Sequence, residues 1–378
     1  MKKIGIYVHI PFCKQKCLYC DFVSYSGKLN NAKEYVERLK AEIVNTAKKI
    51  ETDNIIVNTI YFGGGTPSYI NEEYILEILE TIKSQFILDE NIEITLELNP
   101  GTANKEKLRY YKNIGINRIS IGLQSTEDKI LKLLGRIHNY KEFVQIYKDA
   151  REVGFENINI DMIIGVPTQT IENVKDSVNK ILELNPEHIS IYSLIVEENT
   201  PLENKIANGE LVLPDEDLER EIYWYTKRKL ESNGYKHYEI SNYAKKGRES
   251  KHNLNCWNQD EYLGFGVAAH SYFNNQRYSN TDSMEEYINE KEIYKIQTIN
   301  EIQTIEDKEK EYMLLGLRKI DGVNIAEFKN KFIENPIYTF RNEIDKLVKE
   351  DLIEVDLNSI KLTNKGIDLA NIVWEEFV

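Results

Sequence analysis

The sequence predicts an α/β fold: an incomplete, TIM-like (β/α)6 barrel followed by a C-terminal winged-helix-like α+β domain. In the first half of the chain, short β-branched runs alternate with amphipathic stretches, which is the pattern of βα units around a parallel sheet. Beyond Tyr294 the pattern changes to charged amphipathic helices and one hairpin. Six strands are too few to close an eight-stranded barrel, so the barrel is expected to be open.

The strands of the barrel are expected at short apolar runs, and its helices at longer amphipathic runs between them. The predicted strands are 4–9, 59–62, 92–98, 118–123, 158–164 and 188–194, and the predicted helices are 32–50, 72–86, 105–113, 140–153 and 171–184.

Residues suited to chemistry follow the carboxyl ends of these strands, where barrel active sites are built. A cysteine loop follows the first strand, and the run from Gly63 to Pro67 follows the second. That glycine run lacks the Lys-Ser or Lys-Thr pair of a phosphate loop. It predicts either close approach of the main chain to a ligand or a tight turn.

Three cysteines, Cys13, Cys17 and Cys20, have the spacing C-x3-C-x2-C. Three thiolates on one loop can hold three corners of a cubane 4Fe–4S cluster and leave the fourth iron open to another ligand. A closed zinc site with a fourth ligand from elsewhere is the alternative. A disulfide framework is disfavoured, because the only other cysteine, Cys256, is distant in sequence.

The composition indicates a cytoplasmic protein in a reducing compartment. The formal net charge is −14, and no basic stripe suggests nucleic acid as a partner. Residues 4–10 are too short for a signal sequence, and no apolar run approaches membrane-spanning length. We therefore expect neither export nor a membrane anchor.

Several motifs together resemble radical S-adenosylmethionine (SAM) proteins of the oxygen-independent coproporphyrinogen oxidase superfamily. The resemblance covers nearly the whole chain. It rests on Tyr7-x-His-Ile-Pro-Phe-Cys13-x3-Cys17-x-Tyr-Cys20, Gly63-Gly64-Gly65-Thr66-Pro67, Ile121-Gly-Leu-Gln124-Ser, Leu134-Gly-Arg136 and Ile160-Asp161-x3-Gly165-x-Pro167.

This resemblance implies a barrel of radical SAM type, with a 4Fe–4S cluster on the three cysteines and SAM chelating the open iron. An electron from the cluster would cleave SAM to methionine and a 5′-deoxyadenosyl radical. The implied SAM contacts are Tyr7, Gly64, Gly65, Thr66, Glu97, Gln124, Arg136 and Asp161. Arg136 can pair with a carboxylate, while Glu97 and Asp161 can accept from an ammonium group or ribose hydroxyls. Without the motifs, Glu97 and Asp161 would rather be interpreted as rim carboxylates bonded to backbone amides, and Arg136 as a solvated or ion-paired surface side chain.

Within the superfamily, the loop favours the haem chaperones over the oxidases. The oxidases resemble C-x3-C-x2-C-x-C, whereas Asp21 and Phe22 follow Cys20 here, as in the chaperones. Little more than one strand precedes Cys13, and the oxidases carry a longer segment there. The decarboxylating oxidase remains the alternative function, and a structural zinc protein is a third hypothesis.

The segment Ser250-Lys-His252-Asn-Leu-Asn-Cys256-Trp257 also resembles the chaperones, whose group reads His-Asn-x-x-Tyr-Trp. Cys256 replaces the tyrosine. His252 is a candidate haem ligand, and a hydrogen-bonded structural histidine is the competing interpretation.

Three domains are expected: 1–205 as the barrel with the cluster and SAM sites, 206–295 as an extension carrying the His-Asn segment, and 296–378 as the winged-helix-like domain. That last domain mixes acids with bases and lacks a basic recognition stripe, so a lid or partner surface is expected. The polar stretch 291–305 predicts a hinge over the barrel mouth. The predicted last helix, 365–377, carries an apolar strip that would suit a homodimer.

The chaperone hypothesis implies haem as cargo and haem-accepting proteins as partners, membrane-associated acceptors included. The radical SAM chemistry implies an electron donor such as a flavodoxin or a ferredoxin.

Overall fold

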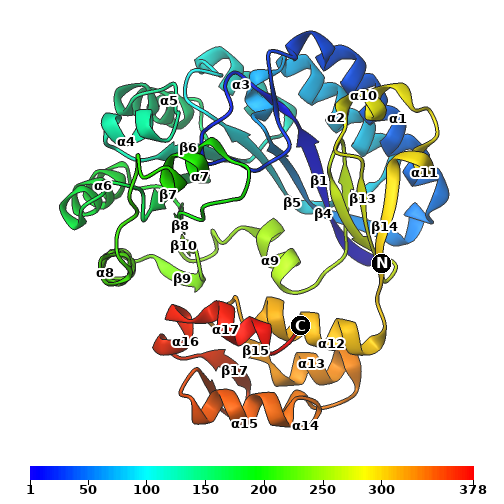
Figure 1. Cartoon of the computed structure of the whole chain (residues 1–378). Helices are drawn as coiled ribbons and strands as arrows, with labels where there is room; N and C mark the ends of the chain where they lie inside the picture. Colours follow the sequence, from blue (N-terminus) through cyan, green and yellow to red (C-terminus); the bar gives the residue numbers. More distant parts are fainter.

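Six parallel strands form the predicted barrel sheet in a computed structural model that describes residues 1–378. The strands run in the order β1 (Lys2–Ile10), β4 (Ile55–Gly64), β5 (Ile87–Leu98), β6 (Arg118–Gln124), β7 (Ile158–Ile164) and β8 (His188–Ser193). The predicted helices are α1 (Ala32–Lys49), α2 (Glu72–Gln85), α3 (Lys105–Ile114), α5 (Tyr140–Glu152) and α6 (Ile171–Leu184), and they cover the outside of the sheet (Figure 1). All six strands and five helices are therefore confirmed.

Six further strands extend this sheet to twelve and were not predicted. At one edge β11 (Tyr262–Phe265) pairs parallel with β1, followed by the antiparallel strands β12 (His270–Phe273), β13 (Gln276–Asn280) and β14 (Gln297–Ile302). At the other edge β10 (Asn242–Ala244) and β9 (Lys236–Glu239) are antiparallel. Strands of three to six residues are too short to show a clear hydrophobic period.

Polar caps fix where the main helices begin. The side chains of Asn104, Asn139 and Thr170 accept hydrogen bonds from backbone N–H groups in the first turns of α3, α5 and α6. The last two caps are capping boxes, completed by Glu142 and Asn173. Since first-turn N–H groups have no partner within the helix, these caps set the boundary between each rim loop and its helix.

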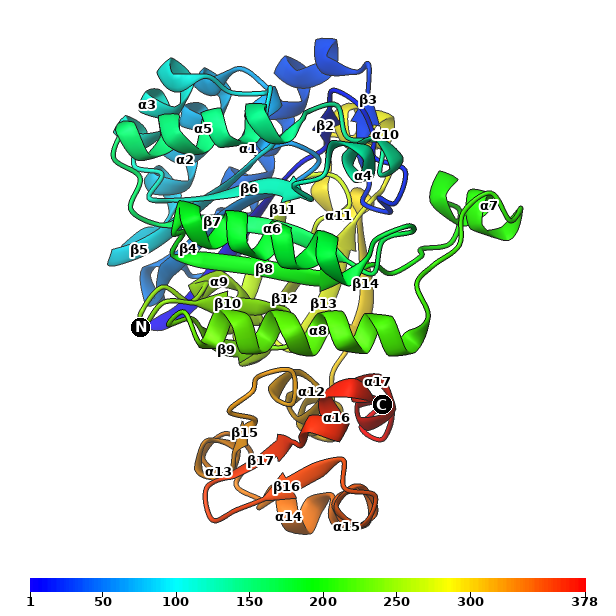
Figure 2. The same cartoon turned by 90° about the vertical axis from the view of Figure 1, so that its left-hand side faces the viewer.

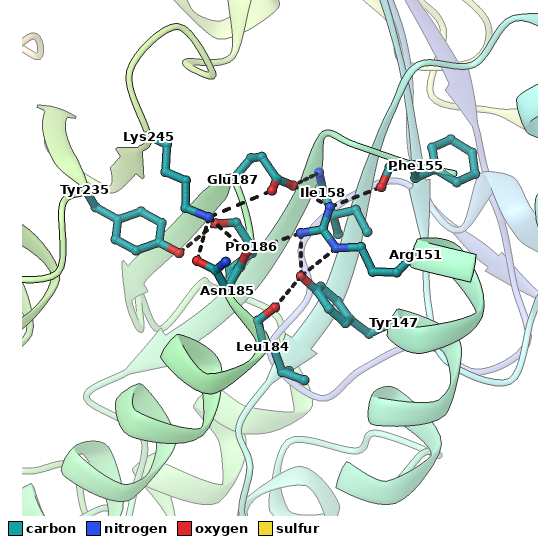
Figure 3. A network of polar contacts seen from close by, with 10 residues as sticks. All are labelled: Tyr147, Arg151, Phe155, Ile158, Leu184, Asn185, Pro186, Glu187, Tyr235 and Lys245. Carbon is teal, nitrogen blue, oxygen red and sulfur yellow. Dashed lines mark hydrogen bonds and ion pairs between the residues drawn. The ribbon is translucent and has the colours of Figure 1, made fainter. Parts of the chain in front are cut away.

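A polar network closes the amino-terminal rim of the barrel, at the end opposite the predicted site (Figure 3). Arg151 on α5 pairs with Glu187 before β8 at 2.7 Å, and also donates to the Tyr147 hydroxyl. The backbone N–H at the start of β7 donates to the same glutamate. Lys245 and Tyr235 donate to the carbonyl groups of Asn185 and Pro186. This rim holds α5, α6 and β10 together, which is a stabilising role.

Further helices follow β8. They are α7 (Pro201–Ala207), α8 (Glu216–Glu231), α9 (Lys251–Trp257), α10 (Met284–Asn289) and α11 (Ile293–Ile296), and α4 (Asp128–Leu133) lies between β6 and α5. Figure 2 shows α7 projecting beyond the carboxyl ends of the strands. In contrast, α9 packs against β1 and β4.

One buried cluster of 55 side chains runs from Ile4 to Ile296. Its members come from the first six strands and also from β11, α10 and α11. Residues 1–205 and 206–295 therefore share a core, while the expected domain limits remain predictions.

A second core of 16 side chains, from Tyr312 to Phe377, belongs to the C-terminal module, which we define as residues 304–378. Its elements are α12 (Ile305–Gly316), β15 (Val323–Asn324), α13 (Ile325–Phe332), α14 (Pro336–Thr339), α15 (Arg341–Lys349), β16 (Ile353–Val355), β17 (Ser359–Leu362), α16 (Asn364–Asp368) and α17 (Ala370–Glu375). The predicted helices and hairpin are present. The predicted last helix is broken at Leu369, which leaves helical geometry and packs against this core.

The predicted hinge and lid are not what the structure shows. Residues 293–302 form α11 and β14, and β14 is hydrogen-bonded to β13. The module packs beside α8, α9 and β9, well away from the carboxyl ends of the barrel strands (Figures 1 and 2). Strand pairing overrides the polar composition that suggested a flexible linker. No helix of the structure has the length and apolar composition needed to cross a membrane.

Candidate functional site

A cavity of about 430 Å³ lies at the carboxyl ends of the barrel strands. Alternate residues of β6 reach into it, namely Ser120, Gly122 and Gln124, as expected for side chains on the inner face of a strand. Ten of the residues predicted for the site line this cavity: Cys13, Cys17, Cys20, Gly64, Gly65, Thr66, Glu97, Gln124, Arg136 and Asp161. Tyr7 and His252 do not.

The cysteine loop is pinned at both ends. A short parallel pair, β2 (Phe12–Cys13) and β3 (Tyr25–Ser26), brackets it, and the N–H of Leu18 donates to the carbonyl of Leu134 at 3.0 Å. All three thiols are free. Burial raises the pKa of Cys13, and it raises that of Cys20 to about 11. Metal binding must therefore displace protons from these thiols.

Nowhere do three His, Cys, Asp or Glu side chains converge as ligands of one metal ion. A closed zinc site would need four such ligands around one atom. The thiolates of a cubane cluster instead bind different irons, so they need not meet at one point. The donor set of three free thiols facing one cavity fits the cluster.

The glycine run makes room for the cysteine loop. A Cβ at Gly64, where φ is +105°, would lie 2.5 Å from the His9 ring, and one at Gly65 would lie 2.9 Å from the Ile10 carbonyl oxygen. The N–H groups of Gly65 and Thr66 donate to the carbonyls of Ile10 and Phe12, both at 2.9 Å. The expected close approach is therefore made to the cysteine loop as well as to the cavity.

Tyr7 lies behind the cysteine loop. Its hydroxyl bonds with Nδ1 of His9 at 3.0 Å, and Nε2 of His9 bonds with the Val23 carbonyl at 2.9 Å. Burial lowers the pKa of His9 to about 4, so the ring is neutral at pH 7. Val23 directly precedes β3, so the hydrogen bonds from Tyr7 through His9 to Val23 orient the end of the cysteine loop that leads into β3.

Two half-buried carboxylates line the cavity. The Tyr61 hydroxyl donates to Glu97 at 2.8 Å, and burial together with nearby Asp161 raises the pKa of Glu97 to about 7. Asp161 accepts from Ser120 and Asn159 at 2.9 and 2.7 Å, and burial raises its pKa too. Tyr61 and Ser120 lie on neighbouring strands, and Asn159 lies on β7 itself, so the bonds to both carboxylates come from side chains of the sheet.

Arg136 and Gln124 line the same cavity and have unused donors. Arg136 makes no ion pair within the chain, although its Nη2 donates to the Gly122 carbonyl at 2.7 Å and its Nη1 lies 3.6 Å from the Cys17 sulfur. The side chain of Gln124 has no hydrogen-bond partner, and its backbone has a φ of +69°. A guanidinium without a carboxylate partner beside a cavity suits an anionic group on a ligand.

Sequence reasoning did not single out several lining residues. Asn99, Gly122, Tyr61 and Tyr192 all line the cavity. Asn99 could have been predicted from its position after the third strand. Gly122 and Tyr61 could have been predicted because they alternate along their strands with residues already assigned to the site. Tyr192 could be placed only once the register of β8 was known.

Several apolar side chains also line the cavity. Ile163, Leu194, Ile195 and Phe22 are among them, and Phe22 and Ile195 are 61% and 69% exposed. Large apolar side chains left open to solvent beside a pocket suit a hydrophobic ligand or partner.

His252 lies on α9, outside this cavity. Its Nδ1 bonds with the Thr59 hydroxyl at 2.9 Å, and its ring stacks on Tyr61 with centroids 5.1 Å apart. Burial lowers the pKa of His252 to about 4. Nδ1 is therefore engaged, and only Nε2 is available as a ligand atom.

A chain of hydrogen bonds connects α9 to the cavity. The Ser250 N–H at the start of α9 donates to the Tyr238 hydroxyl at 3.3 Å, which bonds with Nε2 of His188 at 2.7 Å. Nδ1 of His188 donates to Asn159 at 2.6 Å, and Asn159 donates to Asp161. Burial holds the pKa of His188 well below its usual value, so its ring is neutral.

The fold and the cysteine-lined cavity define a protein of the radical SAM superfamily. The sequence profile of the Radical SAM superfamily matches residues 7–181, and that of the HemN C-terminal domain matches residues 304–369. Two proteins named heme chaperone HemW are similar along the whole chain. The one from Bacillus subtilis is 38% identical over 98% of both chains, and the one from Lactococcus lactis is 37% identical over 100% of this chain and 98% of its own. The chain therefore belongs to the HemW family.

The solved structure of coproporphyrinogen III oxidase (HemN) from Escherichia coli shares the fold. It superposes with a TM-score of 0.84 over 100% of this chain and 90% of its own, at 23% identity. At that identity the likeness concerns the fold alone.

Proposed function

We propose that this protein is a cytoplasmic haem chaperone that binds a 4Fe–4S cluster with SAM and delivers haem to acceptor proteins such as respiratory cytochromes. The observation that carries the proposal is the pairing of full-length HemW similarity with a cavity lined by Cys13, Cys17 and Cys20. Asp21 and Phe22, in place of a fourth nearby cysteine, favour the chaperone over the oxidase.

Each side chain of the cavity has a role in this proposal. The three cysteines would hold the cluster, which when bound would supply single electrons to a ligand at its open iron. Arg136 would pair with the ligand carboxylate, and the Gln124 amide would donate or accept beside it. Glu97 and Asp161 would accept from the ammonium group or ribose hydroxyls, with Gly64, Gly65 and Thr66 as the opposite wall. Tyr7 would act through the cysteine loop.

For the cargo, His252 is proposed as a haem-iron ligand through Nε2, since Thr59 engages Nδ1. Haem-accepting proteins, membrane-associated ones included, and an electron donor such as a flavodoxin or a ferredoxin complete the proposal. A homodimer is compatible with it.

The cluster is tested by anaerobic reconstitution of the wild type, Cys13→Ala and the control Cys256→Ala. We expect about four irons per chain and the EPR signal of a reduced cubane for the wild type and the control. Cys13→Ala should lose most of both. Full cluster content in Cys13→Ala, or zinc in the purified wild type, would remove the proposed site.

The haem function is tested by an anaerobic titration followed by incubation with an apo-cytochrome. We expect saturable haem binding and transfer to the acceptor, with no vinyl groups formed on coproporphyrinogen III under turnover conditions. His252→Ala should weaken binding and shift the Soret band, while His270→Ala, at an exposed position, should not. Coproporphyrinogen turnover without haem transfer would establish the oxidase instead.

A further inference from the structure

We propose that Asn99 is a positioning residue that aims one hydrogen-bond donor at each of two cluster cysteines, Cys13 and Cys17. The inference rests on the proposed function, because it concerns the environment of the cluster. Asn99 follows β5 and touches neither sulfur. Its amide lies between Thr66 and Arg136, each of which does contact a cysteine sulfur.

The contacts form a continuous arc across the cavity wall. The Thr66 hydroxyl lies 3.6 Å from the Cys13 sulfur, and Asn99 Nδ2 donates to the same hydroxyl oxygen at 3.0 Å. On the other side, Arg136 Nη2 donates to Asn99 Oδ1 at 2.5 Å, and Arg136 Nη1 donates to the Cys17 sulfur at 3.6 Å.

The direction of each bond in this arc follows from the arginine. A guanidinium can only donate, so the Asn99 oxygen must face Arg136 and its NH₂ group must face Thr66. The Thr66 oxygen then accepts from Asn99. Its own proton is left free to point at the Cys13 sulfur. A side-chain amide can accept on one side and donate on the other, which neither a carboxylate nor an ammonium group can do.

Gly122 on β6 keeps the space for this contact. A Cβ there would lie 2.5 Å from Asn99 Oδ1 and 3.0 Å from Arg136 Nη2, and the Gly122 carbonyl accepts from the same nitrogen at 2.7 Å. Gly122 therefore allows Asn99 and Arg136 to meet without taking part through a side chain.

Donors to cluster sulfurs stabilise the more negative, reduced cluster and so raise its midpoint potential. Removing these hydrogen bonds, or turning the Thr66 hydroxyl away from Cys13, should lower the midpoint potential while the three cysteine ligands stay in place. A residue with a purely structural role would change stability or cluster content without changing the potential of the clusters that do form.

The experiment measures cluster content, EPR spectrum and midpoint potential of the reconstituted full chain. We expect a more negative potential for Asn99→Ala, which loses both arms. Asn99→Asp can still accept from Arg136 but turns the Thr66 proton away from Cys13, so its potential should also fall. Gly122→Ala should shift it in the same direction, although it deletes no hydrogen-bonding group.

The variants Thr66→Val and Thr66→Ser distinguish the loss of a hydrogen bond to Cys13 from a general effect on folding. Val removes the hydroxyl and should lower the potential, while Ser keeps the hydroxyl and should restore the wild-type value. Asn113→Ala, an exposed asparagine on α3, is the matched control and should leave the potential unchanged. If Asn99→Ala takes up no cluster, its midpoint potential cannot be measured, and the comparison of Thr66→Val with Thr66→Ser tests the inference instead.

Potentials of the Asn99, Gly122 and Thr66→Val variants that all equal the wild-type value, with full cluster content, would overturn the inference and leave the proposed function standing. A wild type that binds no iron–sulfur cluster would instead overturn both.

Discussion

Glu97 shows how the interior of the barrel changes the chemistry of a single residue. Its carboxyl is buried beside Asp161, and the resulting pKa of about 7 lies well above the ordinary value of 4.5. The Tyr61 hydroxyl and the nearby Arg118 act in the opposite direction, favouring the charged form. Glu97 therefore exchanges its proton in the physiological range, although no pattern in the sequence marks it for this.

We predict that SAM binding strengthens as the pH rises through about 7, because only the ionised Glu97 accepts fully from an ammonium group or hydroxyls. Glu97→Gln should flatten this dependence between pH 6 and 8. His9 and His138, whose pKa values are lowered by burial to about 4, do not titrate in that interval. Calorimetric titration of reconstituted protein with SAM at several pH values checks the prediction. An unchanged slope in the variant would contradict it.

The same shift predicts how stability changes with pH. The folded-state pKa is higher than the unfolded one, so stability from this group falls as the pH rises from about 4.5 to 7 and stays low above that. Glu97→Gln should therefore stabilise the apoprotein at pH 8, by roughly 1–3 kcal/mol, and have little effect at pH 4. Urea unfolding at the two pH values measures this difference.

At the scale of elements, α9 is held by buried polar bonds on several sides. Glu93 on β5 accepts from the N–H groups of Lys251 and His252, and Asn255 donates to Asn58 at 3.0 Å. Together with the chain through Tyr238 and His188, these bonds fix the helix against the inner strands of the barrel. The sequence indicated a distinctive segment here, but not that it would lie within reach of β4 and β5.

Tyr238→Phe should test this element. The change removes the hydroxyl shared by Nε2 of His188 and the N–H of Ser250, and leaves both buried without a partner. We expect a loss of about 1–3 kcal/mol in unfolding free energy, measured with urea. Tyr338→Phe, at an exposed tyrosine, is the control and should cost almost nothing. Equal losses of unfolding free energy in both variants would show that the hydrogen bonds of the Tyr238 hydroxyl contribute no stability.

At the scale of the whole molecule, the C-terminal module is attached through a half-buried arginine. The guanidinium of Arg318 lies 4.4 Å from the ring centroid of Trp257 on α9 and 4.8 Å from that of Trp374 on α17. Its backbone carbonyl accepts from the N–H of Ile240, and the N–H of Ile320 donates back to Tyr238, at 3.1 Å each. The module therefore adds to the side of the barrel and covers α9.

Arg318→Ala should loosen this attachment. Stacking of a half-buried guanidinium on two aromatic rings is worth about 1–2 kcal/mol. We expect faster amide hydrogen exchange in α9 and β9, while exchange in α5 and α6 stays unchanged. Arg341→Ala, at an exposed arginine, is the matched control. Unchanged exchange in α9 and β9 of Arg318→Ala would show that other contacts hold the module.

The six βα units, the cysteine loop and the family could be predicted from the amino-acid sequence alone. Apolar period and cysteine spacing are local properties, so they can be seen without knowing which segments meet. The spacing of Cys13, Cys17 and Cys20 alone is enough to predict three ligands of one iron–sulfur cluster.

The remaining features became visible only in the folded chain. The six extra strands, the sideways position of the C-terminal module and the burial of His252 depend on pairing between segments far apart in the chain. The arc through Asn99 joins loops that lie far apart in the chain, and no motif indicates that they touch one another. Such features depend on the register of strands and on packing distances below 4 Å, and no local pattern of residues encodes either of them.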